Sequence, residues 1–125
     1  MFTSFFSSQS RGSWIPPIDI SDQDKKYTMI MDLPEVKKEN LKVYTEKGNV
    51  VCISGNRLRS KLEEDQKDLL IVAERGYGRF ERCFAFPTSI DDSSLKATFR
   101  NQTLIVDVPK EANKDTNSSS SISIE

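Results

Sequence analysis

The sequence predicts an all-β sandwich, and three observations support this fold class. Apolar and polar residues alternate with a period of two in most segments between Tyr27 and Val108, as in strands with one buried face. Turn residues recur between these segments at the spacing of a sandwich. No stretch sustains a helical apolar stripe, so we expect sheets rather than helices to form the core.

The first predicted elements are a single strand and, after it, a hairpin of two strands. Residues 27–33 are apolar on one side, and Pro34 ends the segment. Residues 41–46 alternate again, and Lys47-Gly48-Asn49 supplies a permissive backbone for a hairpin turn into residues 50–54. Because residues 50–54 are apolar on both sides, we expect this strand to be central in its sheet and buried on both faces.

The later strands repeat the pattern. Residues 79–86 place three phenylalanines on one side and end at Pro87. Arg82 lies on the same apolar side, where a guanidinium needs carboxylate or carbonyl partners, unless it is satisfied locally or reaches back to solvent. Residues 95–100 and 103–108 form the last predicted pair of strands.

A long charged segment interrupts the strands. Residues 56–68 are rich in charge, and five consecutive apolar residues follow them at 69–73. A charged loop of this length is uncommon in a compact domain unless it has a function or is disordered. We expect the apolar run to be a strand that is covered by another subunit, which makes a candidate interface of Leu69, Leu70, Ile71 and Val72.

The two ends differ from the strand region. Residues 1–17 are poor in charge and are expected to form a flexible arm whose exposed aromatic residues are Phe2, Phe5, Phe6 and Trp14. Residues 111–125 form a serine-rich tail that carries Ile122 and Ile124 near its end. In an extended tail these two side chains point the same way, so they could enter neighbouring sockets beside a strand edge. An inert, frayed terminus is the alternative.

Composition excludes several classes of partner. The 125 residues suit one domain, and 18 basic against 19 acidic residues leave a net charge of −1. No field favours nucleic acid or an anionic membrane, and no signal peptide or membrane span is recognisable, so we expect a cytoplasmic protein. In that compartment Cys52 and Cys83 are expected to be reduced core residues rather than a disulfide.

The sequence does not indicate an enzyme. Histidine is absent, which removes the usual general base and the commonest metal ligand. The cluster Glu63-Glu64-Asp65 lies in the charged loop and is most simply a solvated surface. Gly76-Tyr77-Gly78 is expected to be a turn and not a phosphate loop, because no P-loop motif is present. We therefore expect no metal, no cofactor and no use of ATP.

Five pieces of the sequence, taken in order, resemble one family. They are 32–34 with 36–43; 51–57; 74–75 with 78–84 and 86–87; 97–101 with 104–110; and the tail Ile122-Ser123-Ile124. On these pieces the chain resembles the small heat-shock proteins, which are built on the alpha-crystallin domain. The likeness spans roughly Ile18 to Lys110, and two departures stand out within it: Glu35 and Gln102 occupy positions where the family usually has glycine. The arm is also shorter than in many members of the family.

The resemblance implies an immunoglobulin-like β-sandwich over residues 18–110, flanked by the arm (1–17) and the tail (111–125). It implies a dimer in which the loop carrying Leu69 to Val72 pairs with the partner's sheet, and it places Arg82 close to that interface. It also implies that Ile122 and Ile124 enter a groove of a neighbouring subunit. We locate this groove at Leu41, Val43, Leu95 and Ala97.

The activity implied by the resemblance is ATP-independent holding of partly unfolded proteins by a dynamic homo-oligomer. Subunit exchange would uncover the grooves and the aromatic residues of the arm, which then capture clients. The competing interpretation is a monomeric co-chaperone or adaptor of the CS-domain type, which shares the sandwich but lacks an exchanged loop and an Ile-x-Ile tail.

Overall fold

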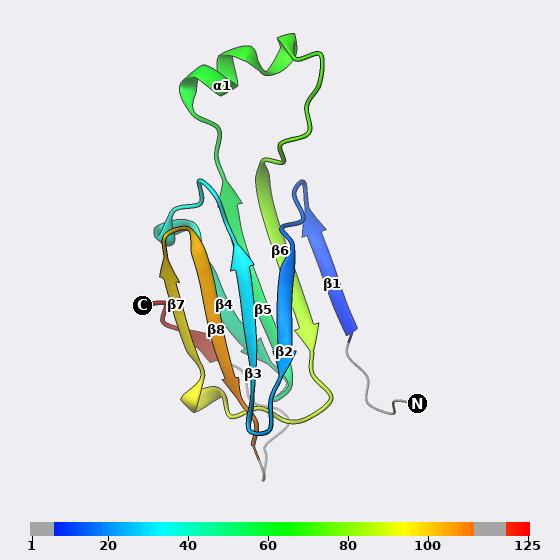
Figure 1. Cartoon of the computed structure of the whole chain (residues 1–125), viewed down its shortest axis with the longest axis vertical. Helices are drawn as coiled ribbons and strands as arrows, with labels where there is room; N and C mark the ends of the chain where they lie inside the picture. The colour runs from blue at the N-terminus through cyan, green and yellow to red at the C-terminus, as the bar shows by residue number, and fades with distance from the viewer. Residues whose placement is uncertain (1–6, 112–119) are drawn as a thin grey trace.

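The computed structural model describes residues 7–111 and 120–125, which fold into two packed antiparallel sheets (Figure 1). The five-stranded sheet has the order β1-β6-β5-β4-β9 and contains β1 (Ser7–Gly12), β6 (Gly78–Ala85), β5 (Val50–Arg57), β4 (Lys42–Glu46) and β9 (Ser120–Ile122). The four-stranded sheet has the order β2-β3-β8-β7 and contains β2 (Ile18–Asp22), β3 (Lys26–Asp32), β8 (Thr103–Pro109) and β7 (Lys96–Arg100). The predicted all-β sandwich is confirmed.

The core lies between the sheets and follows the alternation of the sequence. In β3 the buried side chains are Tyr27, Met29 and Met31, and their strand neighbours are partly or fully exposed. The facing sheet contributes Phe80 and Phe84 of β6, together with other buried residues of β4 and β5. Removing this apolar surface from water is the main favourable term that holds the sheets together.

Strand β5 is central, as its composition predicts. It pairs with β4 on one side and β6 on the other, and Val51, Cys52 and Ile53 are fully buried. Side chains on both faces of this strand therefore have cover, which explains why the sequence is apolar at both parities.

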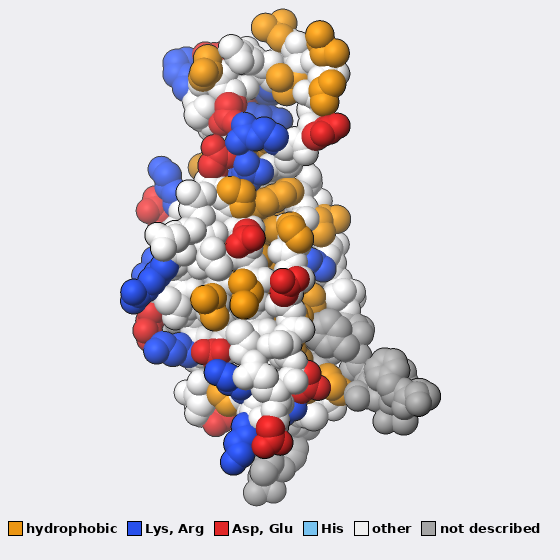
Figure 2. Space-filling model, in the orientation of Figure 1, with side chains coloured by type: hydrophobic (Ala, Val, Ile, Leu, Met, Phe, Trp, Pro, Cys, Tyr) orange, Lys and Arg blue, Asp and Glu red, His pale blue; other side chains and the backbone are white. Residues whose placement is uncertain are grey.

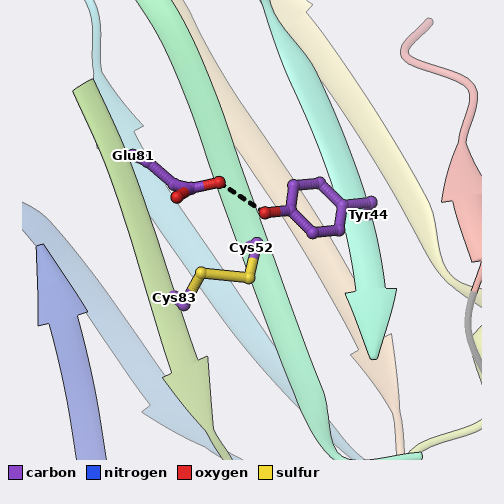
Figure 3. The surroundings of a disulfide bond; sticks show 4 residues. All are labelled: Tyr44, Cys52, Glu81 and Cys83. Carbon is purple, nitrogen blue, oxygen red and sulfur yellow. Dashed lines mark hydrogen bonds between the residues drawn. A yellow bond between two sulfur atoms is a disulfide. The ribbon is translucent and has the colours of Figure 1, made fainter. Parts of the chain in front are cut away.

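The two cysteines form a disulfide, so the expectation of reduced thiols is wrong in this structure (Figure 3). Cys52 of β5 lies directly opposite Cys83 of β6, with 4.0 Å between their Cα atoms. Residues that face each other across antiparallel strands have their Cβ atoms close together. Reduced thiols were predicted from the expected compartment, because the long loop that joins β5 and β6 hides the register in which the two strands pair.

Part of the predicted arm forms a strand of the sandwich. Ser7–Gly12 forms β1, which pairs with β6 in an antiparallel register that sets Ser10 opposite Arg82. This strand was not predicted, because it is built from serine and other polar residues without an apolar period. Its backbone pairing covers what would be a free edge of β6.

Short helices occur only in the connections of the described chain. The loop between β5 and β6 (the 58–77 loop) contains α1 (Lys61–Gln66), and one-turn 3₁₀ helices cover Lys38–Asn40, Lys67–Leu69 and Asp92–Ser94. No helix was predicted, since α1 buries no residue, although Ser60 and Glu63 form the capping box that signals its start. Within the described ranges, no helix has the length and apolar character needed to cross a membrane.

Candidate functional site: a tail-binding groove and an exposed loop

The C-terminal tail lies in a groove at one edge of the sandwich, where it pairs with both sheets. β9 runs antiparallel to β4, with Ile122 opposite Val43. The next residues turn to the other sheet, where Ile124 forms a parallel bridge with Ala97. The Glu125 N–H donates to the Ala97 carbonyl at 2.8 Å, and the Phe99 N–H donates to the Glu125 carbonyl at 2.8 Å. The tail thus joins the β4 edge to the β7 edge.

The side chains of the tail alternate between groove and solvent. Ile122 and Ile124 are partly buried and pack against the hydrophobic core, whereas Ser121 and Ser123 are exposed. Leu41 and Val43 line the hollow beside the two isoleucines, and Ala97 forms the bridge to Ile124. Leu95 is buried in the same core cluster. The structure therefore brings the tail together with the predicted groove, but the groove and tail belong to one chain; docking into a neighbour stays a prediction.

An exposed apolar tip is the second feature of the site. Leu69, Leu70, Ile71 and Val72 do not form a strand in the described chain, and they are 78%, 50%, 98% and 66% exposed. Figure 2 shows hydrophobic side chains gathered at the end of the 58–77 loop, above the sandwich. A single large apolar residue on a surface is ordinary, but four consecutive ones form a patch typical of an interaction site.

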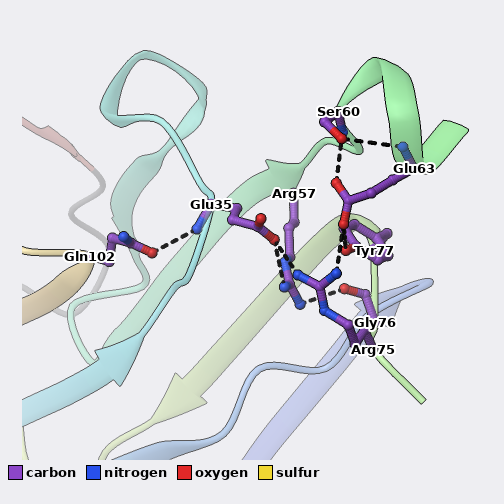
Figure 4. A network of polar contacts seen from close by, with 8 residues as sticks. All are labelled: Glu35, Arg57, Ser60, Glu63, Arg75, Gly76, Tyr77 and Gln102. Atoms are coloured by element: carbon purple, nitrogen blue, oxygen red, sulfur yellow. Dashed lines mark hydrogen bonds and ion pairs between the residues drawn. The ribbon is translucent and has the colours of Figure 1, made fainter. Parts of the chain in front are cut away.

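A polar network connects the base of this loop to the sandwich (Figure 4). Oε1 of Glu35 accepts hydrogen bonds from Nη2 of Arg57 at 2.8 Å and from Nη2 of Arg75 at 2.9 Å. Arg57 ends β5 and is nearly buried, with 7% of its side chain exposed. Its Nη1 donates to the Gly76 carbonyl at 2.7 Å. Both stems of the loop therefore meet at one carboxylate.

The same network reaches α1 through Glu63. Arg75 Nη1 donates to Oε2 of Glu63 at 2.6 Å, and the Tyr77 hydroxyl donates to the same oxygen. The other oxygen accepts from the Ser60 N–H at 2.9 Å. Hydrogen bonds from Tyr77 and from the backbone of Ser60 hold the pKa of Glu63 at about 2, below its ordinary value of 4.5.

A second polar contact crosses the outer face of the five-stranded sheet. The Tyr44 hydroxyl on β4 donates to Oε2 of Glu81 on β6, beside the disulfide (Figure 3). This hydrogen bond to Glu81, together with burial, raises the pKa of Tyr44 to about 12.

Arg82 is satisfied within its own chain in this structure. Its Nε donates to the Ser10 hydroxyl at 3.1 Å, and its Nη1 donates to the Pro16 carbonyl at 2.9 Å. The guanidinium also lies 5.0 Å from the centre of the Phe84 ring. Partial burial lowers the pKa of Arg82. These contacts match the local alternative weighed for this residue, and a role at a dimer interface stays a prediction.

Trp14 packs against the sandwich rather than extending from it. Its ring meets Phe80 edge to face at 5.4 Å and lies 5.1 Å below the Arg57 guanidinium. Gly76 allows this approach, because a Cβ there would come within 2.2 Å of Trp14 Cδ1. Trp14 is therefore not a freely exposed aromatic residue in this conformation, and Phe2, Phe5 and Phe6 lie outside the described residues.

Within residues 7–111 and 120–125, no three acidic or cysteine side chains gather in a way that could hold a metal ion. The polar groups that do cluster, around Glu35 and Glu63, are paired with arginines at the base of a loop. The described chain instead presents an apolar groove filled by its own tail and an exposed apolar tip.

The chain belongs to the Hsp20/alpha crystallin family, whose model matches residues 19–125. The 16.9 kDa class I heat shock protein 3 of rice (Oryza sativa subsp. japonica) is 41% identical over 93 residues, which are 74% of this chain and 61% of the relative. The small heat shock protein C2 of Rickettsia felis is 30% identical over 109 residues, 87% of this chain and 69% of the relative. The chain spans about three fifths of the length of the first curated relatives it matches, 61%, 61% and 60%.

Solved structures agree with this assignment. Heat shock protein 16.0 from Schizosaccharomyces pombe matches with a TM-score of 0.70 and 30% identity, covering 82% of this chain and 71% of that one. The hspA protein from Xanthomonas axonopodis matches with a TM-score of 0.69 and 31% identity, covering 81% of this chain and 98% of that one. The predicted family is therefore confirmed.

Part of the site was not predicted from the sequence. Glu35 and Gln102 stood out only as departures from a family pattern, and Arg57, Tyr77 and Glu63 were not expected to be partners. The capping box at Ser60 is the one local signal that could have placed Glu63. The other partners meet only because β3 and β5 end, and β6 begins, at the same end of the sandwich (Figure 1).

Proposed function

We propose that the protein is an ATP-independent holdase that works as a dynamic oligomer of strand-exchanged dimers in the cytoplasm. The observation that carries this proposal is the exposed apolar tip, Leu69 to Val72, which one chain alone leaves in water. Membership of a chaperone family supports the holding activity, and the class I relatives support the compartment.

The dimer would form when the apolar tip of one chain adds to a sheet edge of another. β2 suits this purpose, because in the described chain it ends the four-stranded sheet and pairs with β3 on one side only. Ile18 and Ile20 of β2 are partly buried and pack against the core, so an added strand would extend an existing apolar surface. Arg82 would act near this contact. The backbone groups of the tip would then be hydrogen-bonded to the partner's strand, and its apolar side chains would be removed from water.

Higher assembly would follow when Ile122 and Ile124 enter the groove of a neighbour instead of their own. The two arrangements use the same contacts, so exchange between them changes few interactions within each subunit. Each contact is weak, and many in one closed assembly act together through effective concentration. The related protein from Xylella fastidiosa, 28% identical, is described as having a distinct high order structure.

Clients would bind where assembly contacts open. The groove at Leu41, Val43, Leu95 and Ala97 becomes an apolar surface when the tail leaves it, and release of β1 would uncover Trp14 beside Phe80. Phe2, Phe5 and Phe6 would add to the surface that captures partly unfolded chains.

One experiment tests the holding activity directly. An aggregation-prone protein is heated with and without the purified chain, no ATP is added, and turbidity is followed. Suppression at an equimolar ratio is expected, with an inert protein of similar size as the control. Full turbidity at that ratio refutes the holdase.

A monomeric adaptor of the CS-domain type is the second candidate, and one observation favours it: the tail fills the groove of its own chain, which leaves the groove closed without a neighbour. Gel filtration separates the two candidates. A mass well above that of one 14.2 kDa chain supports the oligomer, and a monomer supports the adaptor.

A further inference from the structure

The turn after β3 holds a residue in an unfavourable backbone conformation. Glu35 has a φ of 64°, and Gln102 in the β7–β8 turn has the same value. A Cβ makes this left-handed region costly, and glycine occupies it without that cost. The Glu35 N–H donates to Oε1 of Gln102 at 2.9 Å, and the Leu33 N–H donates to the Gln102 carbonyl at 2.8 Å. The two strained turns are therefore locked together.

The side chain of Glu35 provides what glycine cannot. A single carboxylate oxygen accepts from Arg57, the last residue before the 58–77 loop, and from Arg75, near the end of that loop (Figure 4). Arg75 continues the network to Glu63, whose capping box with Ser60 fixes the start of α1. A glycine at position 35 would form this turn without strain. A strained glutamate there is therefore a reason to look for a function of its side chain.

The network holds the stems of the loop and leaves its tip free. Within the described residues, Leu69 to Val72 belong to no strand, and Ile71 is 98% exposed. The loop is thus fixed in direction while its apolar end points into solvent (Figure 2). A segment that is already ordered loses less conformational entropy when it binds.

We propose that Glu35 is a positioning residue for strand exchange: it holds both stems of the 58–77 loop so that the apolar tip is presented to a second copy of the chain. This inference rests on the strand-exchanged dimer of the proposed function. We expect replacement of Glu35 by glycine to weaken dimerisation without destabilising the sandwich. The substitution removes the carboxylate, but it also removes the backbone strain at this position.

The test compares Glu35→Gly with Lys47→Gly in the full chain. Lys47 is also left-handed, with a φ of 58°, but it is exposed in the β4–β5 turn at the opposite end of the sandwich (Figure 1). It therefore reports relief of strain alone. Arg75→Gln removes the other side of the same ion pair without changing the backbone of the turn.

Hydrogen exchange of the amides in residues 58–77 is the first measurement. Glu35→Gly and Arg75→Gln are expected to raise it about tenfold, and Lys47→Gly to leave it unchanged. The thermal midpoint of Glu35→Gly is expected to equal or exceed that of the wild type. The dimer dissociation constant, measured in chains that also carry Ile122→Ala and Ile124→Ala, is expected to rise about tenfold.

Three results overturn or separate the claims. Unchanged amide hydrogen exchange of residues 58–77 in Glu35→Gly refutes the positioning role. A lower thermal midpoint with unchanged dimer affinity also refutes it, because Glu35 would then only stabilise the fold. If the chain with the wild-type Glu35 is monomeric at all concentrations, the strand-exchanged dimer of the proposed function fails. Amide hydrogen exchange of residues 58–77 still decides whether Glu35 holds the stems of the loop.

Discussion

Replacing Ile122 and Ile124 by alanine tests how the tail binds its groove. Each replacement removes three side-chain carbons, and a fully buried methylene is worth about 0.8 kcal/mol. Because both side chains are only partly buried, the pair is expected to contribute about 2 to 3 kcal/mol, or roughly 30- to 150-fold in the docking equilibrium. The backbone pairing to β4 and β7 does not depend on these side chains and stays available.

The assay follows one amide. The Phe99 N–H is hydrogen-bonded to the Glu125 carbonyl, so its exchange with solvent reports whether the tail is docked. Its protection is expected to fall by the same 30- to 150-fold as docking in the double variant. Ser121→Ala with Ser123→Ala is the matched control, because these side chains are exposed on the opposite side of the same segment.

Light scattering on the same samples distinguishes docking within a chain from docking between chains. A fall in particle mass together with the loss of protection shows that tails join neighbours. Loss of protection at constant mass shows that each tail fills its own groove. Unchanged Phe99 protection in the double variant refutes the reasoning altogether, since the tail would not be held by its isoleucines.

Three further predictions concern the sandwich and the loop. Reducing the Cys52–Cys83 disulfide, whose cysteines are 31 residues apart, is expected to lower the free energy of unfolding by about 3 to 4 kcal/mol in denaturant titrations. The chain with both cysteines replaced by alanine should not respond to the reductant, and equal midpoints for the oxidised and reduced wild type contradict the prediction. Arg82→Gly is expected to cost about 1 to 2 kcal/mol by thermal unfolding, because the guanidinium loses its bonds to the arm, whereas Arg79→Gly, at an exposed position of the same strand, should cost less. Since the pKa of Glu63 is depressed from 4.5 to about 2, its stabilisation of the loop is complete above pH 4.5 and is lost as the pH falls through 2; an NMR titration midpoint near 4.5 contradicts this.

Much of the architecture follows from local pattern. The alternation in β3, the doubly apolar β5 and the prolines that end segments are each readable in a single stretch of chain, because burial of one or both faces dictates the residue types there. β1 could not be predicted in the same way, because its polar residues are held by backbone pairing with β6 and not by burial. Helix α1 was not predicted either, because it buries no residue and so has no apolar pattern.

The disulfide and the network around Glu35 depend on relations between distant segments. Cys52 and Cys83 face each other only because β5 and β6 pair in one register across a loop of twenty residues, 58–77. Glu35, Arg57 and Arg75 meet only because three connections lie at the same end of the sandwich. Side-chain hydrogen bonds are short-ranged and directional, so no periodicity in the sequence records them.

The amino-acid sequence by itself determined the two-sheet fold, the family, the central place of β5 and the pairing of Ile122 and Ile124 on one side of the tail, because each depends on residue type and spacing along the chain. Tertiary structure alone decided the register that joins the cysteines, the docking of the tail in its own groove, the incorporation of the arm as β1 and the ties at Glu35. These depend on which backbone edges and polar atoms come within a few ångströms of each other once the sheets are packed.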